Sequence, residues 1–458
     1  MNINKALFDK YNLPTPRYTS YPPANYFTES TSNEQNVEAF KTSNNENPQN
    51  VSIYIHIPFC AHLCLYCGCN TKITKDKEQI KAYVDTLLKE IDLLRPVIDK
   101  NRKISQIHWG GGTPNYLPIE YIIKIMNKFY DNFDFIDSPE IAMECHPAHL
   151  TKEYTKELVN VGFNRLSLGV QDFSDKVLET VQREKAKIPI GEMIDYIRSF
   201  EGVSVNLDFI YGLPFQDEEK YIQTITKAAE LSPDRLAVFS YAHVPWLKKP
   251  QKKLEQYGLP SVDKKIRLFQ AAYKILTESG YTSIGLDHFA KEDDELTIAL
   301  KNKKLHRNFQ GYSTVKTTGQ VYALGVSGIS QLESAYLQNT KNIKDYIKSI
   351  EEGKFPIEKV YFLNKNEKII RAIIESIMCN MYLSYSEIAK QFNVSVNDVF
   401  EITKVDKNDL KVFEQEGLIT INDDGIELTK QGQFFMRNIA AAFDPNMKDN
   451  KKSFSKSL

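Results

Sequence analysis

The sequence lacks the features that would place it in a membrane, on nucleic acid or in the secretory pathway. Its 58 Lys and Arg residues are matched by 59 Asp and Glu residues, so no global field attracts nucleic acid or an anionic membrane. No stretch approaches the ~20 apolar residues of a membrane span. Met1–Tyr11 carries charges and no apolar run, which does not fit a signal peptide. We therefore expect a cytoplasmic protein that binds neither nucleic acid nor a membrane.

Cysteine is scarce and unevenly distributed. The chain has six cysteines, and two of them, Cys145 and Cys379, stand apart from the others, Cys379 in an apolar helical stretch. We interpret these two as small buried hydrophobic residues. Close spacing of cysteines is poor geometry for disulfides and typical of a metal site. The other four cysteines lie within ten residues, as Cys60, Cys64, Cys67 and Cys69.

The first three of these cysteines have the spacing C-x3-C-x2-C. A [4Fe–4S] cluster held entirely by protein needs four thiolates, so a cluster held by Cys60, Cys64 and Cys67 keeps one iron open to a small molecule. Such a cluster can take part in catalysis. Two alternatives remain from the spacing alone: a zinc site completed by Cys69 or His62, and a redox C-x2-C pair.

Apolar runs alternate with helical patterns from residue 51 onward. A chain of 458 residues with 42% apolar composition can form two to three domains, or fewer if an α/β barrel takes most of its length. Alternating strands and helices predict a parallel α/β sheet with right-handed crossovers, and six such units fit an incomplete barrel. The predicted strands are Val51–Ile57, Ile104–Trp109, Glu140–Glu144, Arg165–Leu168, Val203–Phe209 and Arg235–Phe239.

The remaining regions differ in composition. We predict an N-terminal extension over 1–50, which could close as a lid, and a barrel with an accessory segment over 51–364, loop-rich from 285 to 330. Helical patterns followed by a hairpin predict a small, mainly helical, winged-helix-like domain over 365–446. DNA binding is the alternative function for that domain. The polar, Lys-rich end over 447–458 predicts a disordered tail.

A glycine-rich turn follows the second predicted strand, as His108-Trp109-Gly110-Gly111-Gly112-Thr113-Pro114. Glycine lets backbone groups approach a ligand closely. The spacing is not G-x-G-x-x-G and no Lys follows, so it does not fit a nucleotide-phosphate loop. An ordinary glycine turn is the alternative.

Single polar residues stand at or near the ends of later strands. Glu144, Gln171 and Asp208 can accept hydrogen bonds from hydroxyl or ammonium groups, and Arg183 can pair with a carboxylate through its planar fork. Each of these residues taken alone is more often a structural ion pair or helix cap. Because the carboxyl ends of parallel strands meet at one rim, we expect these side chains to lie together.

The segment from Tyr54 to Asn70, YIHIPFCAHLCLYCGCN, resembles the radical S-adenosylmethionine enzymes and, within them, the oxygen-independent coproporphyrinogen III oxidases. The similarity extends from about residue 10 to residue 445. It implies an incomplete (β/α)6 barrel. Further segments that resemble this family are Arg17–Pro22, Ser240–His243, Gly285–Ala290 and His306–Tyr312.

The resemblance also implies a role for individual residues. Cys60, Cys64 and Cys67 would hold a [4Fe–4S] cluster, with Tyr54 and the non-ligand Cys69 as catalytic residues. Ala242 and Ile329 align with contacts to a second S-adenosylmethionine. His146, in Cys145-His146-Pro147, departs from the pattern, since many relatives have Asp or Asn there. The residues implied to contact S-adenosylmethionine are Tyr54, Tyr66, Gly112, Thr113, Glu144, Gln171, Arg183 and Asp208.

The implied activity is the conversion of coproporphyrinogen III to protoporphyrinogen IX without oxygen. A 5′-deoxyadenosyl radical would start the oxidative decarboxylation of two propionates, which needs two cleavages of S-adenosylmethionine. An electron donor and an electron acceptor, both unidentified, would be the partners of a monomeric enzyme. A haem chaperone, a haem-degrading radical enzyme, and a zinc- or DNA-binding regulator are the alternatives. Cys69 and Arg17–Pro22 argue against the chaperone.

Overall fold

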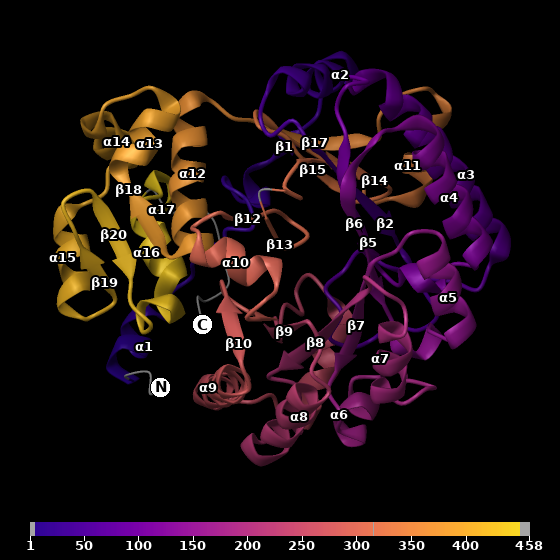
Figure 1. Ribbon diagram of the computed structural model, residues 1–458, viewed down its shortest axis with the longest axis horizontal. Helices are drawn as coiled ribbons and strands as arrows, with labels where there is room; N and C mark the ends of the chain where they lie inside the picture. Colours follow the sequence, from indigo (N-terminus) through magenta and orange to yellow (C-terminus); the bar gives the residue numbers. More distant parts are fainter. Residues whose placement is uncertain (1–4, 315, 449–458) are drawn as a thin grey trace.

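The computed structural model describes residues 5–314 and 316–448. Its largest part is a sheet whose central strands run parallel and follow one another in chain order (Figure 1). Strand β14, Gln320–Leu324, extends this parallel set by pairing with the first strand. The six strands in order are β2 Val51–Ile57, β5 Ile104–Gly111, β6 Phe135–Cys145, β7 Arg165–Gln171, β8 Ser204–Tyr211 and β9 Arg235–Ser240.

Helices connect these strands, as the alternating pattern predicted. The predicted mixed α/β fold is therefore confirmed, with strand boundaries within a few residues, except that β6 begins five residues before its predicted start. The connecting helices are α3 Lys77–Leu94, α4 Ile119–Asn132, α5 Lys152–Asn160, α6 Asp175–Thr180, α7 Ile190–Arg198 and α8 Glu218–Glu230, and α9 Val262–Glu278 follows β9.

Local sequence explains both kinds of element. Strand β2 is buried on both faces, with Ile53 and Ile55 on one face and Ser52 and His56 on the other, as expected of a parallel strand covered on both sides. Helix α4 buries one stripe of side chains that includes Ile122 and Phe129. Helix α3 begins at Asp76, whose carboxylate accepts hydrogen bonds from the first-turn backbone.

The sheet stays open in the described chain, because antiparallel strands extend it at both ends. At one end β15, β16, β17 and β1 follow β14, and at the other end β11 and β10 follow β9. The loop-rich segment predicted over 285–330 is wrong in this respect, since short strands and a helix fill much of it. The elements that extend the sheet or lie in and near this segment are β1 Thr28–Glu29, β10 Tyr281–Ile284, β11 His288–Lys291, α10 Glu295–Lys301, β12 Leu305–Arg307, β13 Tyr312–Thr314, β15 Ile329–Gln331, β16 Ala335–Asn339, α11 Ile343–Glu351 and β17 Ile357–Phe362.

The C-terminal segment forms a second lobe beside the barrel (Figure 1). The predicted hairpin is present, and a third strand, β18, pairs with it. The sequence did not predict β18 or helix α14. The elements are α12 Lys365–Asn380, β18 Tyr382–Ser384, α13 Tyr385–Phe392, α14 Val396–Thr403, α15 Lys407–Gln415, β19 Ile419–Ile421, β20 Gly425–Leu428, α16 Met436–Ala442 and α17 Pro445–Lys448.

The N-terminal extension is folded onto both parts of the molecule. Helix α2, Asn33–Thr42, buries Phe40 in the core of the barrel. Helix α1, Lys5–Tyr11, and the following Tyr18 and Tyr21 belong instead to the hydrophobic core of the C-terminal lobe. The composition of the N-terminal extension did not predict this packing, because only a few aromatic residues within a polar segment make the contacts.

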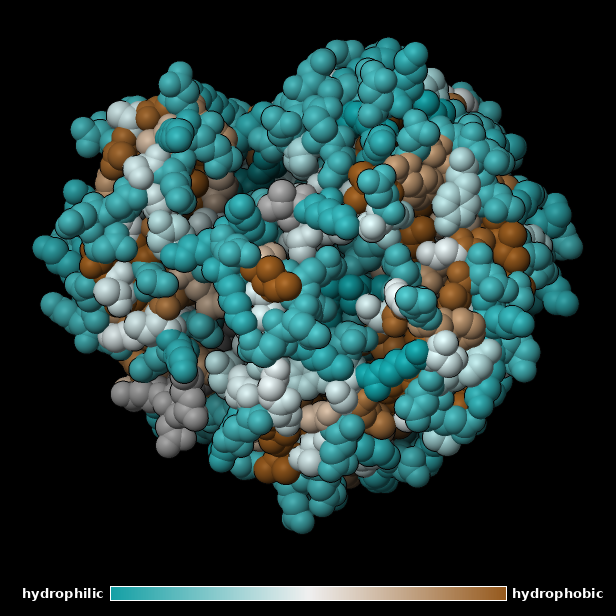
Figure 2. Space-filling view, viewed as in Figure 1, coloured by the Kyte–Doolittle hydropathy of each residue, from teal (hydrophilic) through white to brown (hydrophobic). Residues whose placement is uncertain are grey.

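The surface in the view of Figure 1 is mostly hydrophilic, with an indentation between the two lobes (Figure 2). Across the described residues, no helix combines the length and the apolar character needed to cross a membrane. Of the tail predicted over 447–458, residues 449–458 lie outside the described residues.

Candidate functional site

A cavity of about 160 Å³ lies at the carboxyl ends of the parallel strands. Eleven of the site residues predicted from the sequence line it, so the structure brings them together as expected from a parallel sheet. They are Cys60, Cys64, Tyr66, Cys67, Cys69, Gly112, Thr113, Glu144, Gln171, Arg183 and Asp208.

The cysteine loop forms one wall of this cavity. Cys60 is buried at the end of the short strand β3, Phe59–Cys60, which pairs with β4, Lys72–Ile73. Cys64 and Cys67 are half-buried and Cys69 is exposed. In the described part of the chain, no three His, Cys, Asp or Glu side chains form a site for a single metal ion.

Two polar side chains contact the cysteine sulfurs directly. Thr113 Oγ1 donates to Cys60 Sγ at 3.3 Å, and Arg183 Nη1 donates to Cys64 Sγ at 3.7 Å. Burial raises the pKa of the Cys60 thiol to about 11. A hydrogen bond from Cys69 lowers the pKa of Cys67 to about 6. Arg183 places a positive charge beside the thiolates, where it favours their ionised form.

The glycine turn closes against the cysteine loop through its backbone. Gly112 N donates to Ile57 O at 2.8 Å, and Thr113 N donates to Phe59 O at 3.0 Å. A Cβ at position 112 would lie 2.8 Å from Pro58 O and 2.9 Å from Cys60 Sγ. Only glycine fits here without a shift, so the turn and the cysteines form one unit.

Acidic and amide groups form the opposite wall. Glu144 Oε1 lies 3.1 Å from His108 Nε2, and Asp208 Oδ2 accepts a hydrogen bond from Ser167 at 2.9 Å. Burial raises the pKa of Asp208 to about 6. Gln171 has a positive φ of 71°. Its Oε1 is buried and has no hydrogen-bond partner among the described residues, so the cavity presents an acceptor ready for a ligand.

Tyr54 does not line this cavity itself; His108 lies between Tyr54 and Glu144 of the cavity wall. It lies on β2 with its ring stacked on His108, the two centroids 6.1 Å apart. Its hydroxyl lies 3.2 Å from His56 Nδ1, and burial raises its pKa well above the usual value. His108 in turn contacts Glu144. The structure therefore places Tyr54 behind the cavity wall.

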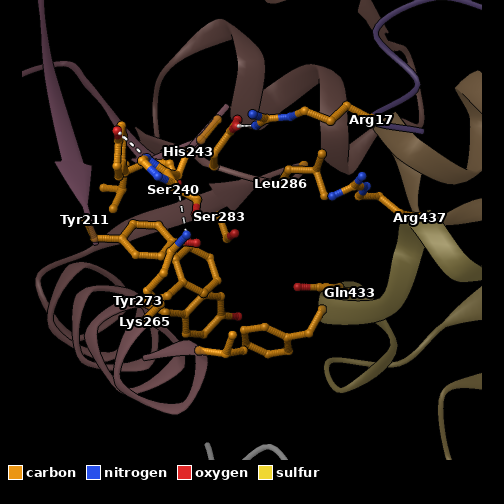
Figure 3. A pocket seen from close by; sticks show the side chains of 18 residues that line it. Arg17, Tyr211, Ser240, His243, Lys265, Tyr273, Ser283, Leu286, Gln433 and Arg437 are labelled. Carbon is orange, nitrogen blue, oxygen red and sulfur yellow. Dashed lines mark hydrogen bonds and ion pairs between the residues drawn. The ribbon is translucent and has the colours of Figure 1, made fainter. Parts of the chain in front are cut away.

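Ala242 lines a different and larger cavity, of about 430 Å³. Figure 3 shows Arg17 and Arg437 entering this cavity from one side and Lys265 from the other. Tyr211, Val238 and Ser240 line it from β8 and β9. Side chains alternate between the faces of a strand, and Asp208 has the opposite parity to these residues in the paired register. These three side chains therefore lie on the opposite face of the sheet from Asp208, and Ala242 lies beyond the end of β9.

Ile329 lines neither cavity. It lies at the start of β15 and packs against a small hydrophobic cluster that contains Phe27, Tyr336 and Leu363. The structure therefore does not bring Ile329 together with Ala242.

Sequence reasoning did not single out several residues that contribute to the site. His108 and Ser167 hold Glu144 and Asp208, and strand alternation with period two could have found them. His146 lines the cavity, and burial lowers its pKa to about 2, so the ring is neutral at physiological pH. Its backbone N–H donates to Asn115 Oδ1 at 2.8 Å.

An arginine on β12, Arg307, lines a small cavity together with residues of the N-terminal segment and of α12. Arg307 Nε and Nη1 are buried and make no hydrogen bond within the described residues. The guanidinium lies 5.1 Å from the Tyr312 ring centroid, and that ring lies edge-on to His288 at 5.2 Å. His288 also contributes to the electrostatic environment of Asp208. Tyr312 and Asp287 contribute to the electrostatic environment of Arg307, and Arg307 lines neither of the two cavities above.

Comparisons with known proteins identify relatives of the whole chain. The profile of the Radical SAM superfamily matches residues 54–228, and that of the HemN C-terminal domain matches residues 363–435. The chain is 40% identical to an oxygen-independent coproporphyrinogen III oxidase from Synechocystis sp., over 100% of this chain and 98% of the relative. For the Escherichia coli protein of that description the identity is 39%, over 96% and 94% of the two chains.

A solved structure is similar to the whole chain. It is described as coproporphyrinogen III oxidase (HemN) from Escherichia coli, a radical SAM enzyme, and is 37% identical. The match covers 97% of this chain and 99% of that chain, with a TM-score of 0.88.

Proposed function

The chain belongs to the oxygen-independent coproporphyrinogen III oxidases of the radical S-adenosylmethionine superfamily, and from this we infer that it converts coproporphyrinogen III to protoporphyrinogen IX. Two propionate side chains become vinyl groups by oxidative decarboxylation. The named relatives favour this function over haem degradation or haem transfer. The observation that carries the residue assignments below is the convergence of eleven predicted residues on one cavity.

Cys60, Cys64 and Cys67 would hold the [4Fe–4S] cluster, with Arg183 and Thr113 supporting the sulfurs. The fit rests on the glycine at position 112, where a Cβ would collide with the cysteine loop, and on the unpaired Oε1 of Gln171. When bound, the cluster and S-adenosylmethionine supply the radical chemistry that the decarboxylation requires. Cys69, exposed at the mouth, is free of a ligand role in this assignment.

The polar wall would orient S-adenosylmethionine. Glu144 and Asp208 can accept hydrogen bonds from its ammonium or ribose hydroxyl groups, and the Gln171 amide can accept one more. Arg183 can neutralise its carboxylate. Tyr66, which lines the same cavity, offers an aromatic face. Tyr54 then acts by positioning His108 and Glu144.

A second S-adenosylmethionine per active site is part of the proposal, because two propionates react in each turnover. Ala242 and Ile329 were predicted to contact it. Ala242 is exposed and lies on a cavity large enough for a small molecule. Equilibrium dialysis of the cluster-loaded enzyme tests the stoichiometry: two molecules bound per chain are expected, and one would contradict it.

Arg307 would anchor a substrate propionate. A buried guanidinium with two unpaired N–H groups is complementary to a carboxylate, which it can bind in a bidentate geometry. The guanidinium lies over the Tyr312 ring, which in turn contacts His288. The anchored propionate would hold the macrocycle at a fixed distance from the reacting group.

An anaerobic assay tests the function. The reconstituted protein would receive S-adenosylmethionine, dithionite, a cell-extract electron acceptor and coproporphyrinogen III, and chromatography would detect protoporphyrinogen IX and 5′-deoxyadenosine. Both products are expected. Consumption of haem in place of coproporphyrinogen would contradict the substrate. We also predict a cytoplasmic monomer with a separate electron donor and acceptor, and light scattering tests the monomer.

A further inference from the structure

The segment after β9 presents apolar side chains to solvent in an unusually basic stretch. Trp246 is 74% exposed and Leu247 is 72% exposed. Residues 244–254 contain four lysines and no acidic residue, although the whole chain has 58 basic and 59 acidic residues. Isolated exposed hydrophobic residues are common, whereas adjacent ones within a charged rim mark a site of interaction. We call Trp246, Leu247, Lys249, Lys252 and Lys253 the Trp246 patch; all five are exposed.

The segment that carries this patch is hydrogen-bonded to the cysteine loop. Lys248 Nζ donates to the backbone carbonyl of Cys69 at 2.6 Å. Gln251 Nε2 donates to the carbonyl of Tyr66 at 2.9 Å, while its Oε1 accepts from Val244 N at 2.7 Å. These bonds fix the segment against the backbone that carries the cluster ligands.

A buried apolar cluster supports the same contact. Leu254 from the 3-10 helix Lys249–Tyr257 and Leu65 from the cysteine loop belong to one small core, together with Tyr241. The segment that carries the Trp246 patch is therefore packed against the cysteine loop as well as hydrogen-bonded to it.

We propose that the Trp246 patch is the docking surface for a small acidic electron-transfer protein that reduces the cluster. This inference rests on the proposed function, because a [4Fe–4S] cluster used for radical chemistry must receive each electron from outside. Lysines around an exposed aromatic residue fit such a partner: the charges steer an acidic protein to the surface, and Trp246 supplies an apolar anchor. Electron-transfer complexes are typically small and transient.

The charge of the patch also argues against the other occupants. A second copy of this chain would place the same lysines opposite one another in a symmetric contact, and like charges there are unfavourable. An anionic membrane could attract the lysines, so it is included in the test as a separate outcome.

Binding can be measured without any turnover, because the two tryptophans differ in exposure. Trp109 is fully buried, whereas Trp246 is exposed. Titration of the cluster-loaded enzyme with an acidic plant-type [2Fe–2S] ferredoxin should protect Trp246 from acrylamide quenching, and calorimetry gives the Kd. The Kd should increase at least fivefold between 50 and 200 mM salt if the lysines steer the complex.

A charge-reversed variant tests the surface. K249E/K252E/K253E should increase the Kd for ferredoxin at least tenfold and remove most of its salt dependence. Cleavage of S-adenosylmethionine driven by dithionite should stay unchanged, because that small reductant needs no docking surface. K390E/K407E/K411E, with the same change in charge on exposed lysines of the C-terminal lobe, is the matched control and should keep the wild-type Kd. W246F should weaken binding with no change in charge.

Three results would overturn the proposal. The first is an unchanged Kd in the patch variant, and the second is equal weakening in both charge-reversed variants. The third is binding to phosphatidylglycerol vesicles but not to ferredoxin, which would assign the patch to a membrane. A wild-type enzyme that binds ferredoxin at the patch but cleaves no S-adenosylmethionine would contradict the proposed function alone.

Discussion

At the scale of single residues, the site depends on close contacts that leave no space for a larger side chain at position 112. The backbone of Gly112 lies between the Pro58 carbonyl and the Cys60 sulfur. Gly68, inside the same cysteine loop, has open space where its Cβ would be. These two glycines look alike in the sequence, and only their surroundings distinguish them.

Gly112→Ala should displace the cysteine loop, because its Cβ would lie 2.8 Å from Pro58 O, far inside contact distance. We expect a loss of most bound iron and sulfide and at least tenfold weaker binding of S-adenosylmethionine. Iron and sulfide analysis after reconstitution measures the first effect. Gly68→Ala is the control and should keep both properties. Equal behaviour of the two variants would contradict the close contact between position 112 and the cysteine loop.

Arg307 is the second residue whose surroundings suggest a function. Arg307→Lys keeps the charge and removes the planar fork, and Arg307→Met removes both. We expect KM for coproporphyrinogen III to rise about tenfold in the first variant and further in the second, with S-adenosylmethionine binding unchanged. Steady-state kinetics and dialysis measure these two quantities. A loss of kcat at unchanged KM would instead contradict an anchoring role.

At the scale of elements, Glu90 connects four parts of the barrel. It lies on α3, where its carboxylate accepts hydrogen bonds from Gly325 N at 2.7 Å, from Tyr346 on α11 at 2.7 Å and from Asn339 on β16 at 3.0 Å. Burial raises its pKa to about 7. The helix next to the cysteine-bearing strand is thus fixed to the strands that extend the sheet.

Glu90 should make stability depend on pH in a defined direction. Its folded pKa is raised above the unfolded value of 4.5, so its stabilising contribution is full below pH 4.5 and is lost as pH rises through about 7. The loss amounts to about 3 kcal/mol at most. Urea unfolding between pH 5 and 8 should show this slope in the wild type and a smaller slope in Glu90→Gln. Parallel curves would refute the assignment.

At the scale of the whole molecule, two hydrophobic cores stand side by side. The division near residue 365 stays a prediction, and the separate cores support it. The chain crosses between them at its N-terminus, where Tyr18 and Tyr21 donate hydrogen bonds to Asp444 at 3.0 and 3.1 Å. The predicted lid is in this structure a strap that joins the barrel to the C-terminal lobe.

Deletion of residues 1–24 should therefore impair the C-terminal lobe before the cluster site. We expect loss of turnover, faster proteolysis within 365–446, and an unchanged content of about four irons and four sulfides per chain. Full turnover in the truncated protein would contradict both the lid and the strap. Loss of the cluster would mean that the segment supports the barrel directly.

The sequence by itself determined the parallel fold, and it predicted that the loop cysteines and most of the polar groups around the cavity would lie together. Periodicity and residue chemistry are local, and a parallel sheet places the carboxyl ends of its strands at one rim. Tertiary structure alone decided that Ala242 and Ile329 do not line the same described cavity and that two N–H groups of Arg307 make no hydrogen bond within the described residues. It also decided that α1 belongs to the core of the C-terminal lobe and that Lys248 contacts the Cys69 carbonyl. These facts depend on contacts between residues far apart in the chain, which no local pattern records.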